Sequence, residues 1–282
     1  MTDARQPHSL PIALLVAMIL SASSMATRAQ NLREQFPTPL ILDPVTFQTE
    51  TKDSIGMFTS IANAVFKPPG NGPFPAVVLM HTCGGVGNPH ILQHARELFQ
   101  EGYVVLVVDS FGPRGLENCS SRTLSVSAGL ADAYAGLALL TSKSFVDKGR
   151  IYQVGYSWGA MVSTLLASPQ SAQIFGSSLR FNATVSNYST CVYQAKYHLV
   201  LKDLDKPVLM LLGERDQELP PTSCFPLLEE MKATGAPVKW HVLPGATHGW
   251  DKVGQSNRGY AYNEQTSKDA TRKLLEFLAE NR

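Results

Sequence analysis

The pattern G-x-S-x-G in the segment "QVGYSWGAM" constrains the fold of this chain more than any other feature. Ile151–Val154 is a short, bounded apolar run that predicts a buried strand, and from Ala160 the apolar spacing predicts a helix. Ser157 therefore lies on a strand-to-helix turn. Because so sharp a turn has little room for neighbouring side chains, Gly155 and Gly159 suit it. The unit is typical of a nucleophile elbow, which exposes a reactive serine.

The rest of the chain alternates between apolar runs and helical patterns. We expect strands at 76–80, 103–110, 151–156, 181–186, 207–213 and 238–245, and helices at 90–100, 126–142, 226–234 and 268–280. Two alternating segments, 45–50 and 60–68, are expected to lead the sheet as strands, with an antiparallel direction open to them. Strands that are apolar throughout and alternate with helices indicate a parallel sheet covered on both faces. We therefore predict a single α/β domain over residues 30–282, with a mostly parallel central sheet.

In sheets of this kind, ligands bind beyond the carboxyl ends of the strands. Five of the expected strands end in segments that carry chemically capable residues: "HTCGGVG", "DSFGPRG", the elbow serine, "ERD" and "PGATHGWD". All five gather at one edge of the predicted sheet. We therefore expect a functional site at that edge.

A serine hydroxyl is a poor nucleophile near neutral pH. It needs a general base, and the base needs an acid that fixes its tautomer. On a fold of this kind the chain order is serine, then acid, then histidine. The candidates in that order are Ser157, Asp216 and His248. His248 lies between Gly245 and Gly249, so its loop can bring the imidazole close to the elbow.

Other residues compete for these roles. His81 is a rival base, but it ends a strand ahead of the elbow and suits a structural hydrogen bond better. Glu214 and Glu218 are expected to be solvated loop carboxylates. Asp216 is preferred because it is set slightly back from the strand end, where a loop residue can turn toward the histidine. A nucleophilic thiol at Cys83 is a further alternative, although no elbow or helix follows it.

Acyl transfer also requires hydrogen-bond donors for the oxyanion of the tetrahedral intermediate. One expected donor is the N–H of the residue after the nucleophile, here Trp158, and a loop after an early strand supplies the second. The glycines of "HTCGGVG" allow a close backbone approach. We expect the Cys83 N–H in this role, with Thr82 next. Thr82 is also a candidate substrate contact.

Two further residues are candidates for contact with the substrate. Arg114 in "GPRG" could hold a substrate carboxylate in a bidentate grip or could pair with a loop acid, and the sequence favours neither. Trp250, together with Trp158 and Tyr156, could wall an apolar acyl pocket. Aromatic residues this close to a sheet edge more often serve packing, so both readings stay open.

The amino terminus has the pattern of a secretory signal peptide. Arg5 precedes the apolar run "LPIALLVAMIL", small residues follow, and cleavage is expected after Ala29 or Ala26. The run is too short to span a bilayer comfortably. A buried core helix or a retained anchor is the alternative. We expect residues 1–29 to be removed and the mature protein to be exported, to the periplasm or the medium.

Four cysteines remain after that cut, and an even number in an exported chain fits two disulfides with three possible connectivities. Their spacing does not resemble a metal site, so no metal is expected. The net charge is +1, and no dense Lys/Arg cluster alternates with aromatic residues. Nothing therefore indicates nucleic-acid binding or charge-driven membrane binding.

These segments together resemble the dienelactone hydrolase family of α/β-hydrolases. The resemblance runs from about residue 76 to the C-terminus and rests on "VVLMHTCGG", "GYVVLVVDSFGPRG", "DKGRIYQVGYSWGA", "LMLLGERD" and "ATHGWD". It implies the α/β-hydrolase fold, hydrolysis of carboxylic ester or lactone bonds without a cofactor, and the triad named above. It also implies that Cys83 pairs with Cys119 and that Cys191 pairs with Cys224, since each pair follows neighbouring strands.

The chain departs from the family pattern at two positions. Members that open dienelactones usually carry Cys as the nucleophile, where this chain has Ser157, and they tend to have an acidic residue in place of Thr82. The expected function is an exported serine hydrolase acting on small or medium carboxylic esters. A peptidase or amidase of the same fold, and a non-catalytic binding protein on a hydrolase scaffold, are the alternatives.

Overall fold

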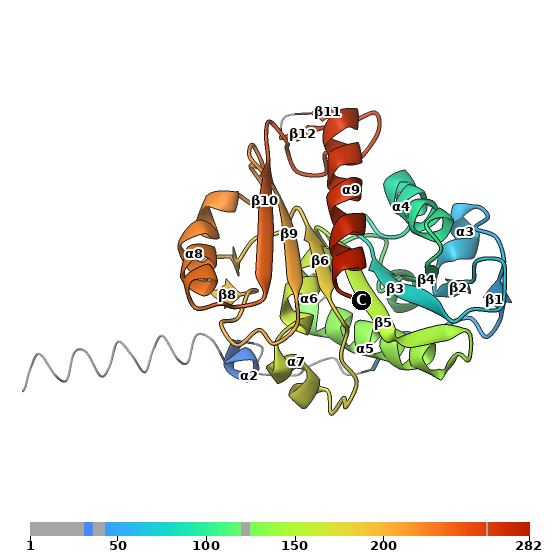
Figure 1. The fold of residues 1–282 in the computed structure, drawn as a ribbon. Helices are drawn as coiled ribbons and strands as arrows, with labels where there is room; N and C mark the ends of the chain where they lie inside the picture. Colours follow the sequence, from blue (N-terminus) through green and yellow to red (C-terminus); the bar gives the residue numbers. More distant parts are fainter. Residues whose placement is uncertain (1–30, 36–42, 120–124, 258) are drawn as a thin grey trace, which may run out of the picture.

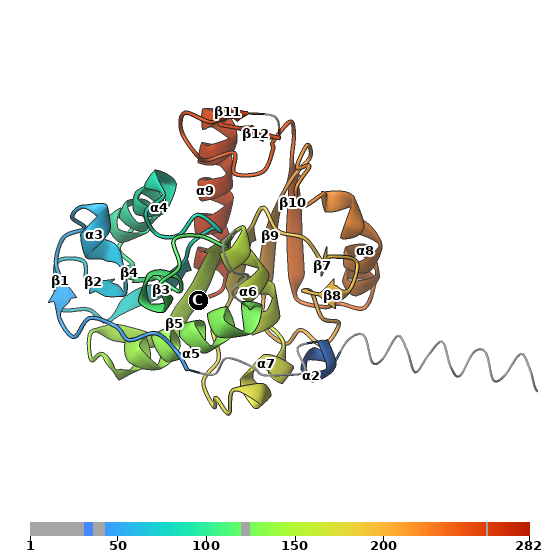
Figure 2. The ribbon, with the colours of Figure 1, turned by 180° about the vertical axis from the view of Figure 1, so that it is seen from behind.

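The computed structural model describes residues 31–35, 43–119, 125–257 and 259–282, so the predicted signal peptide lies outside it. Its centre is an eight-stranded sheet with helices on both faces (Figure 1 and, from behind, Figure 2). In chain order the sheet strands are β1 (Thr51–Lys52), β2 (Ala64–Phe66), β3 (Phe74–Met80), β4 (Val104–Val108), β5 (Val146–Tyr156), β6 (Thr184–Asn187), β9 (Val208–Gly213) and β10 (Val238–Leu243).

The strand order across the sheet is β1-β2-β4-β3-β5-β6-β9-β10. β2 pairs antiparallel with β4 and parallel with β1, and all other neighbours in this sheet are parallel. The two leading strands therefore run against the other six. This confirms the predicted α/β class with a mostly parallel sheet.

The helices pack in two layers, one on each face of the sheet (Figure 1, Figure 2). In β3, Ala76, Val78 and Met80 face one layer, whereas Val77 and Leu79 face the other. Because both faces of a central strand are buried, these runs are apolar throughout. One layer contains α5 (Val126–Ser142), α6 (Trp158–Leu166) and α8 (Phe225–Ala233), and the other contains α3 (Phe58–Ile61), α4 (Pro89–Gln100) and α9 (Glu264–Glu280).

Several short elements complete the fold. They are the helices α2 (Leu32–Gln35) and α7 (Pro169–Ile174), the 3₁₀ turns η1 (Gly112–Arg114) and η2 (Pro221–Ser223), and two hairpins, β7 (Val192–Tyr193) with β8 (Tyr197–His198) and β11 (Ser256–Asn257) with β12 (Tyr260–Ala261). Within the described part of the chain, the helices are too short or too polar to cross a bilayer.

The start of the sheet differs from the prediction. Residues 45–50 form no strand, and within 60–68 only the three residues of β2 do, after the helical turn α3. The Val45 N–H bonds to a side chain, Asp132 Oδ1, at 2.9 Å instead of to a neighbouring strand. The Ser60 hydroxyl donates to the Met57 carbonyl at 2.6 Å, inside a helical turn. These segments are held by individual side-chain hydrogen bonds, one of them to a residue 87 positions away, and periodicity alone does not distinguish such bonds from a sheet ladder.

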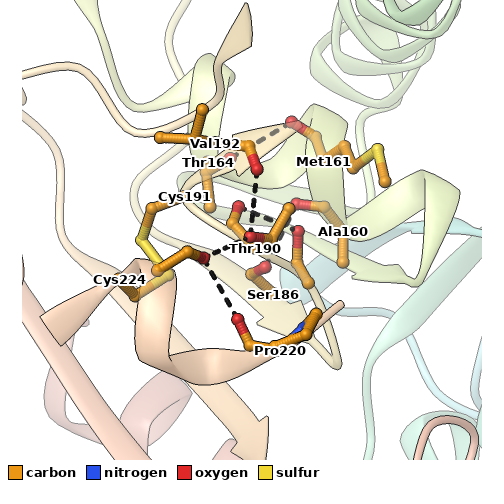
Figure 3. Close-up of a disulfide and its surroundings, with 11 residues drawn as sticks. Ala160, Met161, Thr164, Ser186, Thr190, Cys191, Val192, Pro220 and Cys224 are labelled. Carbon is orange, nitrogen blue, oxygen red and sulfur yellow. Dashed lines mark hydrogen bonds between the residues drawn. A yellow bond between two sulfur atoms is a disulfide. The ribbon is translucent and has the colours of Figure 1, made fainter. Parts of the chain in front are cut away.

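Two disulfides join loops at the carboxyl edge of the sheet. Cys83 pairs with Cys119 and Cys191 with Cys224, the connectivity that the family resemblance implied. The first links the loops after β3 and β4. The second links the loop after β6 to the start of α8, and Figure 3 shows it beside Thr190, whose hydroxyl lies 2.8 Å from that of Ser223. Four of the segments around the elbow are thus covalently tied in two pairs.

Candidate active site

The turn between β5 and α6 places Ser157 at the carboxyl edge of the sheet. Its backbone has φ 51° and ψ −109°, a conformation that costs a non-glycine residue about 1–3 kcal/mol and is concentrated at functional sites. A Cβ at Gly155 would overlap the Gly159 carbonyl, and a Cβ at Gly159 would lie 2.7 Å from the Met80 carbonyl oxygen. The elbow therefore requires glycine at both positions.

Three buried side chains from different loops form a continuous chain of hydrogen bonds. Ser157 Oγ lies 2.9 Å from His248 Nε2, and His248 Nδ1 lies 2.8 Å from Asp216 Oδ2. The Oδ1 atom of Asp216 accepts the N–H groups of Glu218 at 3.0 Å and Leu219 at 2.8 Å. One carboxylate oxygen is therefore held by the backbone, and the other orients the imidazole.

The neighbouring carboxylates have different positions. Glu214 is exposed and accepts the Gly245 N–H at 2.8 Å. Glu218 is also exposed, and its Oε2 lies 3.9 Å from His248 Nε2, the nitrogen that faces Ser157. Of the three acids in this loop, only Asp216 contacts Nδ1. It is therefore the one that can fix the tautomer with Nε2 as proton acceptor.

Backbone hydrogen bonds hold the loops of the acid and the histidine together. The Arg215 N–H donates to the Ala246 carbonyl at 2.8 Å, which joins the loop after β9 to the loop after β10. The His248 N–H donates to the Gly259 carbonyl at 3.2 Å, which ties the histidine to the β11–β12 hairpin. The contact between the imidazole and the carboxylate thus rests on two fixed loops.

The cleft over Ser157 has two lobes that meet at the serine. The larger lobe is mainly apolar and has a volume of about 520 Å³; we call it the apolar lobe. The smaller has a volume of about 210 Å³, and we call it the polar lobe. Cys83, Ser157 and Glu218 line both lobes. The apolar lobe is lined further by Val126, Trp158, Met161, Tyr193, Leu199 and Leu219, and the polar lobe by Thr82, Asn88, His90, His248, Lys252 and Tyr260.

The two backbone groups expected to bind an oxyanion lie beside Ser157. Trp158 is the first residue of α6, and Cys83 lines both lobes. The Gly159 N–H donates to the His81 carbonyl at 3.1 Å, which holds the elbow against the loop after β3. The Cys83 carbonyl accepts the Cys119 N–H at 3.0 Å, while the Cys83 N–H has no acceptor among the described residues. That N–H is available to a ligand.

The loop after β3 contains two further residues that the sequence singled out. His81 is fully buried, with Nδ1 2.7 Å from the Thr82 carbonyl and Nε2 3.1 Å from the Ser110 N–H. Burial lowers the pKa of His81, so the ring is neutral and both nitrogens are occupied. This is the structural role that the sequence favoured. Thr82 lines the polar lobe, where its hydroxyl accepts the Asn88 amide at 3.2 Å.

Arg114 does not line the cleft. Its guanidinium forms a bidentate ion pair with Asp132 of α5, at 2.8 and 2.9 Å, and donates to the carbonyl oxygens of Ser110 and Asp43. Asp132 is fully buried, and a buried carboxylate requires a charged partner. Of the two alternatives for Arg114, the structure shows pairing with an acid, although the acid belongs to a helix and not to a loop.

Trp250 also lies outside the cleft, and of its two alternatives the structure shows packing. It is 1% exposed and packs edge-on against Tyr188, with ring centroids 4.8 Å apart. Tyr156 is likewise a core residue, stacked on His94 at 4.3 Å. Only Trp158 among these candidates lines a lobe. Nearness to the sheet edge does not separate the two cases, because the core continues up to that edge.

A second group of buried and half-buried ionisable side chains lies behind the triad, and no sequence motif indicated it. His94 Nε2 lies 2.7 Å from Asp251 Oδ2, and His94 Nδ1 lies 3.1 Å from Glu97 Oε2. Tyr188 donates to the same Asp251 oxygen at 3.0 Å and packs edge-on against His248. The group therefore anchors the histidine loop to α4. His94 and Asp251 are 157 positions apart, so no local sequence pattern predicts that they pair.

The protonation of His94 should be visible in the stability of the protein. Burial alone would lower the pKa of His94, but hydrogen bonds and charge from Asp251 and Glu97 raise it from 6.5 to about 9. A raised pKa stabilises the folded state fully below pH 6.5, and the contribution is lost as the pH rises through about 9. This contribution to the free energy of unfolding is roughly 3 kcal/mol. We expect urea unfolding to show this loss in the wild-type protein and not in His94→Gln.

The control for this prediction is His241→Gln. His241 is an exposed residue of β10, and burial lowers its pKa. Its titration therefore does not contribute to the change in stability above pH 6.5. This variant should retain the wild-type decline. The same decline in His94→Gln would contradict the assignment of the ion pair.

Comparison with known proteins places the chain in a family. The model of the dienelactone hydrolase family matches residues 61–281. A "Putative carboxymethylenebutenolidase" of Salmonella typhimurium (strain LT2) is 24% identical over 222 residues, which cover 74% of this chain and 78% of that protein. A protein of the same name from Escherichia coli (strain K12) is 23% identical over 273 residues, which cover 90% of this chain and 97% of that protein.

Solved structures show the same architecture. A "Putative Dienelactone Hydrolase" from Klebsiella pneumoniae superimposes with a TM-score of 0.61 and 23% identity, over 76% of this chain and 90% of that chain. A propionate-bound thermophilic esterase from Thermogutta terrifontis superimposes with a TM-score of 0.54 and 16% identity, over 76% and 88%. These likenesses confirm the predicted α/β-hydrolase fold. Because the family model spans most of its length, the chain belongs to the dienelactone hydrolase family and is a hydrolase that acts on ester bonds.

Proposed function

We propose that the protein is an exported serine hydrolase that cleaves carboxylic esters or lactones of small molecules through an acyl-enzyme. The observation that carries this proposal is the hydrogen-bonded chain from Ser157 through His248 to Asp216, placed where the two lobes of the cleft meet. A nucleophile, its base and an acid that orients the base are the parts that acyl transfer requires.

Acylation follows from these distances. His248 Nε2 accepts the proton of the Ser157 hydroxyl as Oγ attacks the ester carbonyl, and Asp216 stabilises the imidazolium that forms. The negative charge that develops on the carbonyl oxygen is bound by the N–H groups of Cys83 and Trp158. Collapse of this intermediate transfers the proton from Nε2 to the leaving alcohol and leaves the acyl group on Oγ.

Deacylation repeats the cycle with water as the nucleophile. His248 Nε2 takes a proton from the water, whose oxygen attacks the acyl carbon, and returns a proton to Ser157 Oγ as the acid departs. The chemistry balances without a cofactor. The triad residues therefore account for each proton in the cycle.

Export is supported by two independent features. The first 29 residues have the charged, apolar and small-residue pattern of a signal peptide. All four cysteines form disulfides, which persist in oxidising compartments. Cell fractionation, with the N-terminus of the isolated protein determined by mass spectrometry, tests this part. Recovery of an uncleaved chain from the cytosol would contradict it.

Labelling with a fluorophosphonate tests the nucleophile directly. Ser157 Oγ should displace fluoride and gain one phosphonyl group, visible in the intact mass of the wild-type protein and absent in Ser157→Ala. Ser163→Ala is the matched control, because Ser163 lies on the same helix but donates to the Gly159 carbonyl at 3.1 Å. Unlabelled wild-type protein would favour the non-catalytic binding protein. Faster turnover of matched amides than of esters would favour the amidase.

A further inference from the structure

His90 is a buried side chain in the cleft that the triad chemistry does not use. It lies in the first turn of α4, is 4% exposed and lines the polar lobe together with Ser157 and His248. Neither of its ring nitrogens has a hydrogen-bond partner among the described residues. Burying polar atoms without partners costs about 1–3 kcal/mol per group, so each such case calls for an explanation. Both nitrogens are shielded from solvent. A ligand in the polar lobe would supply a partner to one of them once the ring turns toward the lobe.

The charge state of His90 limits what that ligand can be. Burial is the main cause that lowers the pKa of His90 to about 4; Asp251 opposes this effect, and positive charge on His94 and Lys252 reinforces it. The ring is therefore neutral at pH 7 and has one N–H donor and one nitrogen acceptor. A hydroxyl group suits either nitrogen, because it can accept a hydrogen bond from the N–H or donate one to the other nitrogen. The ring matches an ionised carboxylate less well, because a carboxylate only accepts.

The position of His248 indicates which part of an ester lies in each lobe. Its Nε2 must hand a proton to the leaving alcohol, so the alcohol oxygen has to come within hydrogen-bond reach of this nitrogen. His248 lines the polar lobe and is not among the residues that line the apolar lobe. The alcohol therefore leaves through the polar lobe, and the acyl chain lies in the apolar lobe against Trp158, Met161 and Leu199.

We propose that the preferred substrates are esters of an apolar acid with a compact alcohol that carries a second hydroxyl group, and that His90 recognises this hydroxyl. The proposal rests on the serine hydrolase function and specifies its substrate class. The size of the polar lobe, about 210 Å³ against about 520 Å³ for the other lobe, is consistent with a short alcohol. Thr82 and Asn88 add polar groups to the same wall.

The test compares two esters of phenylacetic acid whose alcohols have the same number of heavy atoms, the 2-hydroxyethyl ester and the n-propyl ester. The measured quantity is the ratio of their kcat/KM values in each variant, because comparing ratios between variants cancels the intrinsic reactivity of the esters. His90→Leu should lower the ratio about tenfold, which is the effect of one lost hydrogen bond. The change should come from a lower kcat/KM for the hydroxyethyl ester, with kcat/KM for the propyl ester unchanged. His90→Gln, which keeps a donor and an acceptor, should retain part of the wild-type ratio.

Stability separates recognition from a purely structural role. Since His90 loses no hydrogen bond within the described protein, His90→Leu should have a Tm equal to or above that of the wild type. His241→Leu is the control, because His241 lies on β10 and lines neither lobe, and it should leave the ratio unchanged. If His90→Leu fails to fold, the ratio in His90→Ala takes its place.

The possible outcomes distinguish the two proposals. A ratio that is the same in the wild type, His90→Leu and His90→Ala would overturn the role of His90 and leave the serine hydrolase intact. Wild-type protein that hydrolyses neither ester and takes up no fluorophosphonate would overturn the proposed function itself. A lower ratio in His90→Leu with partial retention in His90→Gln supports the substrate class.

Discussion

Replacing Ser157 with alanine is expected to lower kcat for 4-nitrophenyl ester hydrolysis by about 10⁶-fold, the size of effect that loss of a triad serine produces. The variant lacks the oxygen that lies 2.9 Å from His248 Nε2, so no acyl-enzyme can form. Residual hydrolysis would then come only from the oxyanion donors and from the binding of substrate in the cleft. Steady-state kinetics, corrected for spontaneous hydrolysis, measure the loss.

Two controls accompany this prediction. The Tm of Ser157→Ala should stay within a few degrees of the wild-type value, because alanine has the same Cβ as serine at this strained position. Ser163→Ala removes a hydroxyl from the same helix without touching the cleft and should keep most of the activity. Activity in Ser157→Ala within tenfold of the wild type would rule out Ser157 as the nucleophile.

Much of this architecture could be predicted because it has local causes. A strand buried on both faces must be apolar throughout, so β3, β4 and β9 are visible as continuous runs. Only the second half of β5 was predicted, because its first half is polar and partly exposed. The elbow is visible because its backbone excludes side chains at Gly155 and Gly159. Once a parallel sheet is inferred, its carboxyl edge collects the loops of Asp216 and His248 without further information.

The parts that could not be predicted depend on contacts between distant segments. Arg114 follows a strand at the carboxyl edge of the sheet, and its partner Asp132 lies in the middle of the apolar helix α5. The sequence around Asp132 does not indicate a charge pair. Trp250 is two residues from His248, but its ring packs into the core. The partnerless state of His90 is likewise a property of its surroundings, which the helical pattern of 90–100 does not describe.

Replacing Asp216 with asparagine is expected to lower kcat by about 10⁴-fold, although the two side chains have nearly the same shape. Oδ1 of Asp216 accepts two backbone N–H groups, so an asparagine would place its carbonyl oxygen there and turn its NH₂ group toward His248. Nδ1 would then have to accept a hydrogen bond instead of donating one. The ring proton would move to Nε2, and the imidazole could no longer take the proton of Ser157.

A second variant separates orientation by Asp216 from simple negative charge near the histidine. Glu218→Gln removes a charge 3.9 Å from Nε2 but leaves the Nδ1 contact in place, so it should change kcat less than threefold. Asp216→Asn should fold with a Tm close to the wild-type value, because both backbone hydrogen bonds persist. Steady-state kinetics and fluorophosphonate labelling rates for the two variants show which acid orients His248. A large loss in Glu218→Gln with little change in Asp216→Asn would transfer the role of the acid to Glu218.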